Sequence, residues 1–190
     1  LAYSSLMQKW NKAINLTAVR DPSQMLVQHL LDSLSVVAPL RRALGDRPAR
    51  ILDVGSGGGL PGVVLAIVEP TWTVACVDAV GKKVAFIRQV AAELLLRNLS
   101  GVHARVETLK PERAYDLITS RAFASLNDFA TLTASLGDES TIWAAMKGKT
   151  PTDEMAALPT EFAVFHVEQL TVPELDADRC IVWMRKTSTP

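Results

Sequence analysis

Apolar residues recur along the chain with two different spacings, which separate helical from extended segments. Near the N-terminus, Leu6 and Met7 precede Trp10 by four and three positions, the spacing of an amphipathic helix. A second helix is expected over residues 23–39, with Ser23 as its N-cap. Two helices are therefore expected before the first strand.

Beyond residue 50, short apolar runs alternate with helical segments. The expected strands are residues 51–54, 73–77, 102–106, 115–120, 141–146, 162–172 and 179–185. The expected helices between them are residues 60–67, 80–97 and 126–136, and a further helix begins at residues 150–154. The helix over residues 80–97 is expected to bury Leu94 and Leu95. Strands that alternate with helices and end in an antiparallel pair predict a mixed seven-stranded α/β sheet.

Length and composition limit the domain organisation and the possible partners. The 190 residues are expected to form one domain, with a helical extension over residues 1–45 and a Rossmann-like core over residues 46–190. The formal net charge is zero, so any nucleic-acid partner must meet a local basic patch.

Cys76 and Cys180 lie in apolar strands, and we expect buried thiols in a reducing compartment rather than a disulfide. The chain has three histidines and no Cys-x-x-Cys motif, so no metal is expected. The apolar runs are too short for a membrane span, and we expect a cytoplasmic protein.

A glycine-rich turn joins the first strand to a helix in Arg50-Ile-Leu-Asp-Val-Gly-Ser-Gly-Gly-Gly-Leu-Pro-Gly62. Glycine lets the backbone approach a ligand closely. A dinucleotide site has a glycine at the sixth position from Gly55, where this chain has Leu60. Asp53 instead precedes Gly55 by two residues, and Asp78 ends the next strand, where a carboxylate can accept hydrogen bonds from ribose hydroxyls. The pattern Asp-x-Gly-x-Gly-x-Gly resembles the first motif of class I S-adenosylmethionine-dependent methyltransferases. That resemblance implies their Rossmann-like fold and S-adenosyl-L-methionine as cofactor.

Residues expected at the strand ends limit the methyl acceptor, because ligands of open α/β sheets bind outside the carboxyl ends of the strands. Exocyclic amines are often methylated beside an Asp/Asn-Pro-Pro-Tyr turn after the fourth strand, where this chain has Ser120-Arg-Ala-Phe123. A pyrimidine C5 needs a cysteine nucleophile, and neither Cys76 nor Cys180 is well placed. Guanine N7 needs neither group, because its lone pair lies in the ring plane and carries no proton. The lack of an evident general base is therefore consistent with N7 methylation, in which positioning is most of the catalysis.

Several blocks of sequence together are similar to the glucose-inhibited division protein B family. They are Trp10-Asn-Lys-Ala-Ile-Asn-Leu-Thr-Ala-Val-Arg20, His29-Leu-Leu-Asp-Ser-Leu34, Leu60-Pro-Gly62, Lys82-Lys83 with Phe86, Ser120-Arg-Ala-Phe-Ala-Ser-Leu126 and Met146-Lys-Gly148. The likeness extends from Trp10 to about Lys186. It implies a bacterial methyltransferase that modifies N7 of a single guanine in 16S ribosomal RNA (rRNA). The implied partner is therefore this RNA or the small ribosomal subunit.

Candidate site residues come from the resemblance and from the chemistry of the motif. By resemblance, the cofactor contacts are Gly55, Leu60, Val106, Glu107 and Arg121; the chemistry of the turn and of ribose binding adds Asp53, Gly57, Gly59 and Asp78. The residues expected to contact RNA are Arg20, His29, Lys82, Lys83, Phe123, Lys147 and Lys149. Arg121 is the candidate catalytic residue, which would position cofactor or substrate without acting as a base. A guanine flipped out of its stack is expected beside Arg121 and Phe123.

Alternative interpretations exist for single residues and for the whole chain. Arg20 could be a solvated loop charge, His29 a packed side chain and Arg121 part of a structural ion pair. The main functional alternative is a methyltransferase that acts on a protein or a small molecule. A non-catalytic RNA-binding module and a nicotinamide oxidoreductase are weaker, the latter because Leu60 replaces a glycine. We expect a monomer, since no heptad or large apolar stripe is present, and we expect residues to precede Leu1, which begins within a helical pattern.

Overall fold

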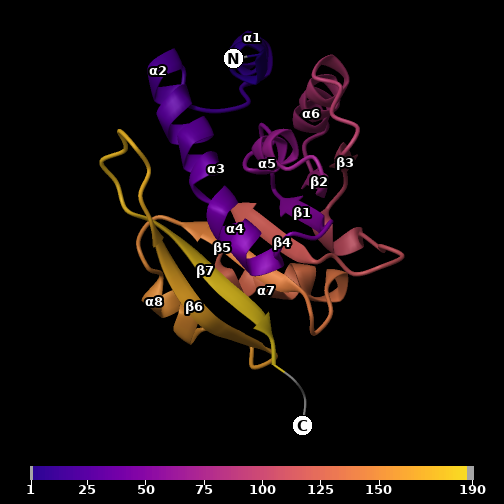
Figure 1. Ribbon diagram of the computed structural model, residues 1–190, viewed down its shortest axis with the longest axis vertical. Coiled ribbons are helices and arrows are strands. Elements are labelled where there is room, and N and C mark those ends of the chain that lie inside the picture. Colours follow the sequence, from indigo (N-terminus) through magenta and orange to yellow (C-terminus); the bar gives the residue numbers. More distant parts are fainter. Residues whose placement is uncertain (1, 188–190) are drawn as a thin grey trace.

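Seven strands form one mixed sheet in the computed structural model, which describes residues 2–187 (Figure 1). The strands are β1 (Arg50–Val54), β2 (Thr73–Asp78), β3 (Leu99–His103), β4 (Leu117–Arg121), β5 (Ile142–Lys147), β6 (Phe162–Leu170) and β7 (Arg179–Lys186). Their order is β3-β2-β1-β4-β5-β7-β6; the first five pair in parallel, and β7 is antiparallel to both of its neighbours. The predicted mixed seven-stranded sheet is confirmed. Residue 1 and residues 188–190, which the domain prediction includes, lie outside the described residues.

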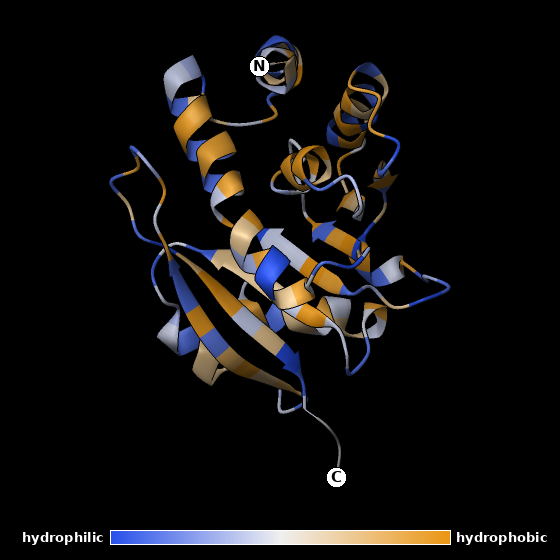
Figure 2. Cartoon of the chain, in the orientation of Figure 1, coloured by the Kyte–Doolittle hydropathy of each residue, from blue (hydrophilic) through white to orange (hydrophobic). Residues whose placement is uncertain are grey.

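Helices pack against both faces of this sheet. One face carries α1 (Ala2–Ile14), α4 (Val37–Leu44), α5 (Gly62–Val68) and α6 (Gly81–Glu93), and the other carries α7 (Leu126–Thr133) with the 3₁₀ helix η3 (Ala134–Leu136), and α8 (Thr152–Ala156). Side chains alternate along β1, so Ile51 joins the first core cluster whereas Leu52 and Val54 join the second. Apolar residues accordingly follow the central strands and the helices that cover them (Figure 2). Among residues 2–187, no helix is both long enough and apolar enough to cross a membrane.

The long helical segment before β1 differs from the prediction at both ends. It comprises α2 (Pro22–Met25), the π-helix η1 (Leu26–Leu31), α3 (Asp32–Ser35) and α4. Asp21 rather than Ser23 is the N-cap, because its carboxylate accepts hydrogen bonds from the N–H groups of Ser23 at 2.9 Å and Gln24 at 3.0 Å. Pro22 fits the first helical position, where a backbone N–H has no partner within the helix. The segment also continues beyond the predicted end at residue 39, to Leu44.

The segment after α6 also corrects the prediction. The helix expected over residues 80–97 ends at Glu93. Leu95 adopts a φ of +54°, a left-handed conformation that does not continue a helix. Its side chain, expected to be buried, is 82% exposed. Asn98 then fixes the turn: its side-chain amide donates at 3.0 Å to the carbonyls of Ala66 and Trp72. Strand β3 consequently begins at residue 99, three positions before the expected strand. Val106, expected at the end of that strand, lies in the 3₁₀ helix η2 (Val106–Thr108).

Candidate active site

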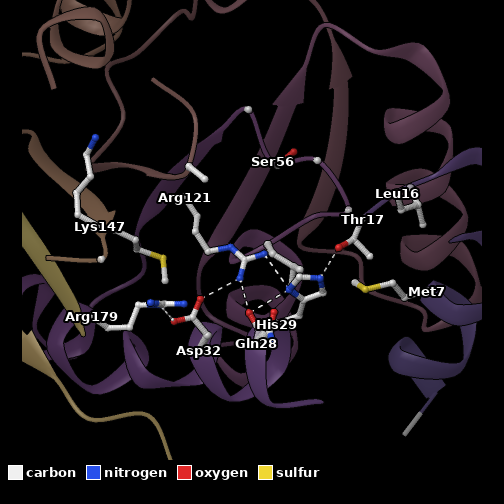
Figure 3. Close-up of a pocket in the computed structure, with 17 residues that line it drawn as sticks. Met7, Leu16, Thr17, Gln28, His29, Asp32, Ser56, Arg121, Lys147 and Arg179 are labelled. Atoms are coloured by element: carbon white, nitrogen blue, oxygen red, sulfur yellow. Dashed lines mark hydrogen bonds and ion pairs between the residues drawn. The ribbon is translucent and has the colours of Figure 1, made fainter. Parts of the chain in front are cut away.

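A cavity of about 500 Å³ opens at the carboxyl ends of the parallel strands (Figure 3). This volume is within the range of small-molecule sites. The lining residues are Met7, Leu16 and Thr17 from the N-terminal segment; Gln28, His29 and Asp32 from the long helix; Gly55 to Gly58 and Leu60 from the glycine turn; and Arg121, Ala122, Met146, Lys147, Gly148 and Arg179 from the far strands. Because β7 is antiparallel to β5, its first residue, Arg179, lies at the same edge of the sheet as the last residues of β4 and β5.

The glycine turn is held against the end of β2. The N–H groups of Gly55 and Ser56 both donate to the carbonyl of Val77, at 2.9 and 3.2 Å. Gly55 has a φ of +64°, and a Cβ atom there would lie 2.3 Å from the ring of Phe123. Only glycine fits this position, because a side chain would be strained by the backbone and would clash with the ring. The turn therefore presents bare backbone to the cavity.

Asp78 anchors the same turn from the end of β2. Its Oδ2 accepts a hydrogen bond from the N–H of Gly57 at 2.9 Å, and its Oδ1 accepts one from the N–H of Val80 at 2.8 Å. A carboxylate has about four acceptor positions, and these two bonds leave others for a ligand. The geometry is therefore compatible with the expected ribose contact while also giving Asp78 a structural role.

Asp53 lies beneath the turn and does not line the cavity. It is fully buried, and its Oδ2 accepts a hydrogen bond from the N–H of Gly62 at 2.8 Å. Its Oδ1 has no hydrogen-bond partner among the described residues. Burial raises the pKa of Asp53 to about 7, and the Gly62 N–H and the Arg121 guanidinium oppose this shift only in part. The structure thus places Asp53 one layer behind the surface that a ligand would touch.

Two arginines share one buried carboxylate in the opposite wall of the cavity. Asp32 is 2% exposed, and its Oδ2 lies 2.9 Å from Nη1 of Arg121 while its Oδ1 lies 2.9 Å from Nε of Arg179. Nη1 of Arg121 also donates to the carbonyl of Gln28 at 2.9 Å, within the π-helix η1. Figure 3 shows both guanidinium groups converging on Asp32. This network fixes the two arginines and leaves the wall with one net positive charge.

His29 completes this wall beside Arg121. Its Nε2 is 2.7 Å from Oγ1 of Thr17, and its Nδ1 is 3.0 Å from the carbonyl of Gln28 and 3.4 Å from Nη2 of Arg121. Burial and the neighbouring guanidinium both lower the pKa of His29, so the imidazole is neutral near neutral pH. Both ring nitrogens therefore have partners, and the ring ties the Thr17 loop to the long helix.

Comparison with known proteins identifies the family to which this site belongs. Residues 1–182 match the model of the GidB family, described as rRNA small subunit methyltransferase G. The chain belongs to this family. The protein of Leptothrix cholodnii named ribosomal RNA small subunit methyltransferase G is 58% identical over 188 residues, which are 99% of this chain and 86% of that protein. The protein of the same name from Bordetella avium is 56% identical, over 98% of this chain and 84% of that protein.

Solved structures confirm the methyltransferase fold of this GidB protein. Magnesium protoporphyrin IX methyltransferase from Synechocystis, determined with bound S-adenosylmethionine, superposes with a TM-score of 0.68 and 16% identity over 98% of both chains. An S-adenosylmethionine-dependent methyltransferase from Aquifex aeolicus has a TM-score of 0.64 and 15% identity, over 90% of this chain and 97% of that one. At these identities the likeness concerns the fold alone. Family and fold together make this chain a class I S-adenosylmethionine-dependent methyltransferase.

The cavity of the GidB protein fits its cofactor at the glycine turn. Ser56 lines the cavity at 4% exposure, and its hydroxyl has no hydrogen-bond partner among the described residues. A buried hydroxyl without a partner is unfavourable, so a polar ligand at this wall would satisfy it. The amino-acid end of adenosylmethionine offers carboxylate and ammonium groups of that kind. In residues 2–187, no group of three potential metal-ligating side chains is placed to hold a metal ion.

The predicted cofactor residues of this GidB protein fall into three groups. Gly55, Gly57, Leu60 and Arg121 line the cavity. Gly59, with a φ of +87°, shapes the turn, while Asp53 and Asp78 bind its backbone from behind and from the end of β2. Val106 is buried in the second core cluster, and Glu107 is exposed next to it; neither lines the cavity. Their predicted cofactor contacts remain predictions.

The predicted RNA residues are more widely spread than the cofactor residues. Only His29 and Lys147 line the cavity, and Nζ of Lys147 is held by Oε2 of Glu154 at 2.8 Å and by the carbonyl of Ala124 at 3.0 Å. Phe123 is half-buried and packs its ring on Gly55. The remaining four lie outside the cavity; they are Arg20, Lys82 and Lys149, which are exposed, and Lys83, which is half-buried. The structure therefore brings together Arg121, His29 and Lys147 but not the other cations.

Sequence reasoning did not assign some residues that line this site. Asp32 and Arg179 carry its ionic network, and Thr17, Gln28 and Ser56 supply further polar groups. The sequence does contain an indication that Asp32 is a site residue, because it is a carboxylate within the apolar pattern of the long helix. Arg179 begins an antiparallel strand, and only the sheet order places that end beside β4 and β5.

Proposed function

We propose that this protein transfers a methyl group from S-adenosyl-L-methionine to N7 of one guanine in bacterial 16S rRNA. Family membership supports the reaction and the RNA. The glycine turn and Asp78 hold the cofactor, and the wall that contains Arg121 and Arg179 faces the guanine nucleotide. When bound, the cofactor supplies an electrophilic methyl carbon; the N7 lone pair forms the new N–C bond, and the electrons of the broken C–S bond stay on sulfur.

One feature of the cavity carries this assignment to N7: its proton acceptors are already engaged. Among the described lining residues, Asp32 and His29 have the side chains that could serve as a general base. Asp32 is bound by two guanidinium groups, and both ring nitrogens of His29 have partners. A methyl acceptor that must lose a proton would find no free base in this cavity, whereas guanine N7 carries no proton to lose. The residues then act by holding the two reactants in line.

Arg121 is the positioning residue in this proposal. Its guanidinium is fixed by Asp32 and by the carbonyl of Gln28, and its side chain is still 20% exposed at the cavity. A fixed cation of this kind can hold a phosphate or a base edge of the flipped nucleotide. Phe123, packed on the glycine turn, offers an apolar surface next to it.

Methyl transfer to small ribosomal subunits from a strain that lacks the gene tests the proposal. Labelled methyl should appear at one guanine of 16S rRNA, mapped by cleavage at N7-methylguanine followed by reverse transcription. Arg121→Ala should lower the rate by about 100-fold or more, since positioning supplies most of the rate enhancement. Arg47→Ala removes an arginine whose side chain is 55% exposed and lies outside the cavity, and it should stay within about twofold of the wild type. Label in protein, or full activity of Arg121→Ala, would contradict the proposal.

We further propose that the protein acts as a cytoplasmic monomer on the RNA or on the assembled subunit. The ribosomal substrate supports the location. Light scattering of the full-length protein should give the mass of one chain. Parallel assays with naked 16S rRNA and with isolated subunits would decide between the two substrates.

A further inference from the structure

Asp53 is a fully buried carboxyl group whose hydrogen bonding is only half satisfied. Its Oδ2 accepts from the N–H of Gly62, and its Oδ1 has no partner among the described residues. No ion pair of the described residues involves either oxygen. An ionised carboxylate is unfavourable at such a place, because burial removes water and only the Gly62 N–H and, at 3.9 Å, the Cys76 thiol replace it, both at Oδ2. The pKa of about 7 means that the proton is lost only near neutral pH.

Four ionisable groups face Asp53 from the elements packed around it. They are Tyr3 of α1, Cys76 and Asp78 of β2, and Arg121 of β4. Burial raises the pKa of Tyr3 and of Cys76, so both are neutral at physiological pH. Asp78 raises the pKa of Asp53 and Arg121 lowers it, so these two charges oppose each other. Loss of solvent is therefore the dominant influence on the pKa of Asp53, and a new charge nearby would shift that pKa.

The charged side chains around the cavity determine whether such a new charge would be balanced. Arg121 and Arg179 carry two positive charges, which the carboxylates of Asp32 and Asp78 balance, while Lys147 is paired with Glu154. A sulfonium cation that enters this cavity therefore adds one positive charge without a partner. An ionised carboxylate at Asp53, beneath the glycine turn, would restore neutrality. A neutral thioether requires no such compensation.

We propose that Asp53 lets this site distinguish its sulfonium cofactor from the neutral thioether product, by releasing a proton to solvent when the cation binds. Methyl transfer moves the positive charge from sulfur to the methylated guanine, and when this guanine leaves with the RNA the cavity holds only a neutral thioether. The Asp53 carboxyl then takes a proton back from solvent, and the product is held more weakly than the cofactor. This inference rests on the cofactor site of the proposed function and is independent of the RNA acceptor.

Calorimetric titration of the wild-type protein without RNA tests this inference directly. Each ligand is titrated at pH 7 in phosphate and in Tris, buffers whose heats of ionisation differ. S-adenosylmethionine should release a fraction of a proton that S-adenosylhomocysteine does not. From pH 6 to pH 8, the dissociation constant of S-adenosylmethionine should fall by about fivefold to tenfold. That of S-adenosylhomocysteine, which has the same amino-acid end, should change by less than about twofold.

Asp53→Asn provides the matched variant, because an amide oxygen can still accept the hydrogen bond of Gly62. It should bind S-adenosylmethionine without the extra proton release. Asp116→Asn, at a carboxyl outside the cavity, should keep the release of the wild type. Equal proton release for both ligands, or release that persists in Asp53→Asn, would overturn the inference. If the Asn variant does not fold, the comparison of the two ligands on wild-type protein still decides. Failure of wild-type protein to bind either ligand would instead overturn the proposed cofactor site.

Discussion

Replacement of Asp32 by asparagine should expose how much the ionic network of the cavity contributes to folding. The carboxylate is 2% exposed and binds two guanidinium groups at 2.9 Å each. Breaking a buried ion pair by removing one partner typically costs about 3–5 kcal/mol. The side chains of Arg121 and Arg179 are 20% and 26% exposed, so water can still hydrate their charges in part after the carboxylate is removed. We therefore expect Asp32→Asn to lower the free energy of unfolding by about 2–4 kcal/mol.

Urea unfolding followed by tryptophan fluorescence measures this loss. Glu168→Gln is the matched control, because it also neutralises a carboxylate paired with an arginine, but Arg42 in that pair is 64% exposed. The control should change the free energy of unfolding by less than about 1 kcal/mol. A loss in Asp32→Asn no larger than in Glu168→Gln would refute the view that the buried carboxylate organises this wall.

Two further variants test the packing and the protonation beneath the glycine turn. At Gly62→Ala, the new Cβ would lie 2.3 Å from Sγ of Cys76 and 2.7 Å from Oδ2 of Asp53, and we expect a loss of roughly 1–3 kcal/mol in thermal unfolding. Gly148→Ala, whose Cβ would meet only a carbonyl at 3.8 Å, should be nearly neutral, and equal losses would contradict the argument. The pKa of Asp53, raised from 3.8 to about 7, means that folded protein keeps a proton that the unfolded chain has lost, so stability falls as pH rises between these values. From pH 5 to pH 8 this group should lower the free energy of unfolding by roughly 3 kcal/mol, and Asp53→Asn should lack that part of the decline; parallel curves for the two proteins would contradict it.

Local patterns in the sequence predicted the glycine turn and the strands of the sheet, although the range expected for β3 was displaced. Most strands are short apolar runs, whereas β3 is Leu-Ser-Gly-Val-His, and the turn needs glycine at Gly55, where a Cβ would meet the ring of Phe123. The end of α6 was harder to predict from the sequence. Leu95 continues the apolar pattern of the helix, and only the hydrogen bonds of Asn98 to a neighbouring segment show why the chain turns there.

The ion pairs of Asp32 with Arg121 and Arg179 could not be predicted from local sequence patterns. Arg121 was predicted from its place after the fourth strand, but its partner Asp32 lies 89 positions away. Arg179 joins the same carboxylate from 147 positions away. No periodicity connects residues at such separations, and their meeting depends on the strand order that places β7 beside β5. The predicted contacts of Arg20, Lys82 and Lys149 concern a surface outside the cavity and stay predictions.

The antiparallel position of β7 has a consequence for the synthesis of the protein. The turn from Gly55 to Leu60 can form once β1 and β2 have left the ribosome, but Arg179 follows about a hundred residues later. In a nascent chain that has not yet released β7, Asp32 has one arginine partner instead of two, and the cavity lacks the part of its lining that Arg179 supplies. Under the proposed function, competence for methyl transfer therefore requires that β7 has emerged, and fragments that end before β7 would keep the glycine turn without Arg179.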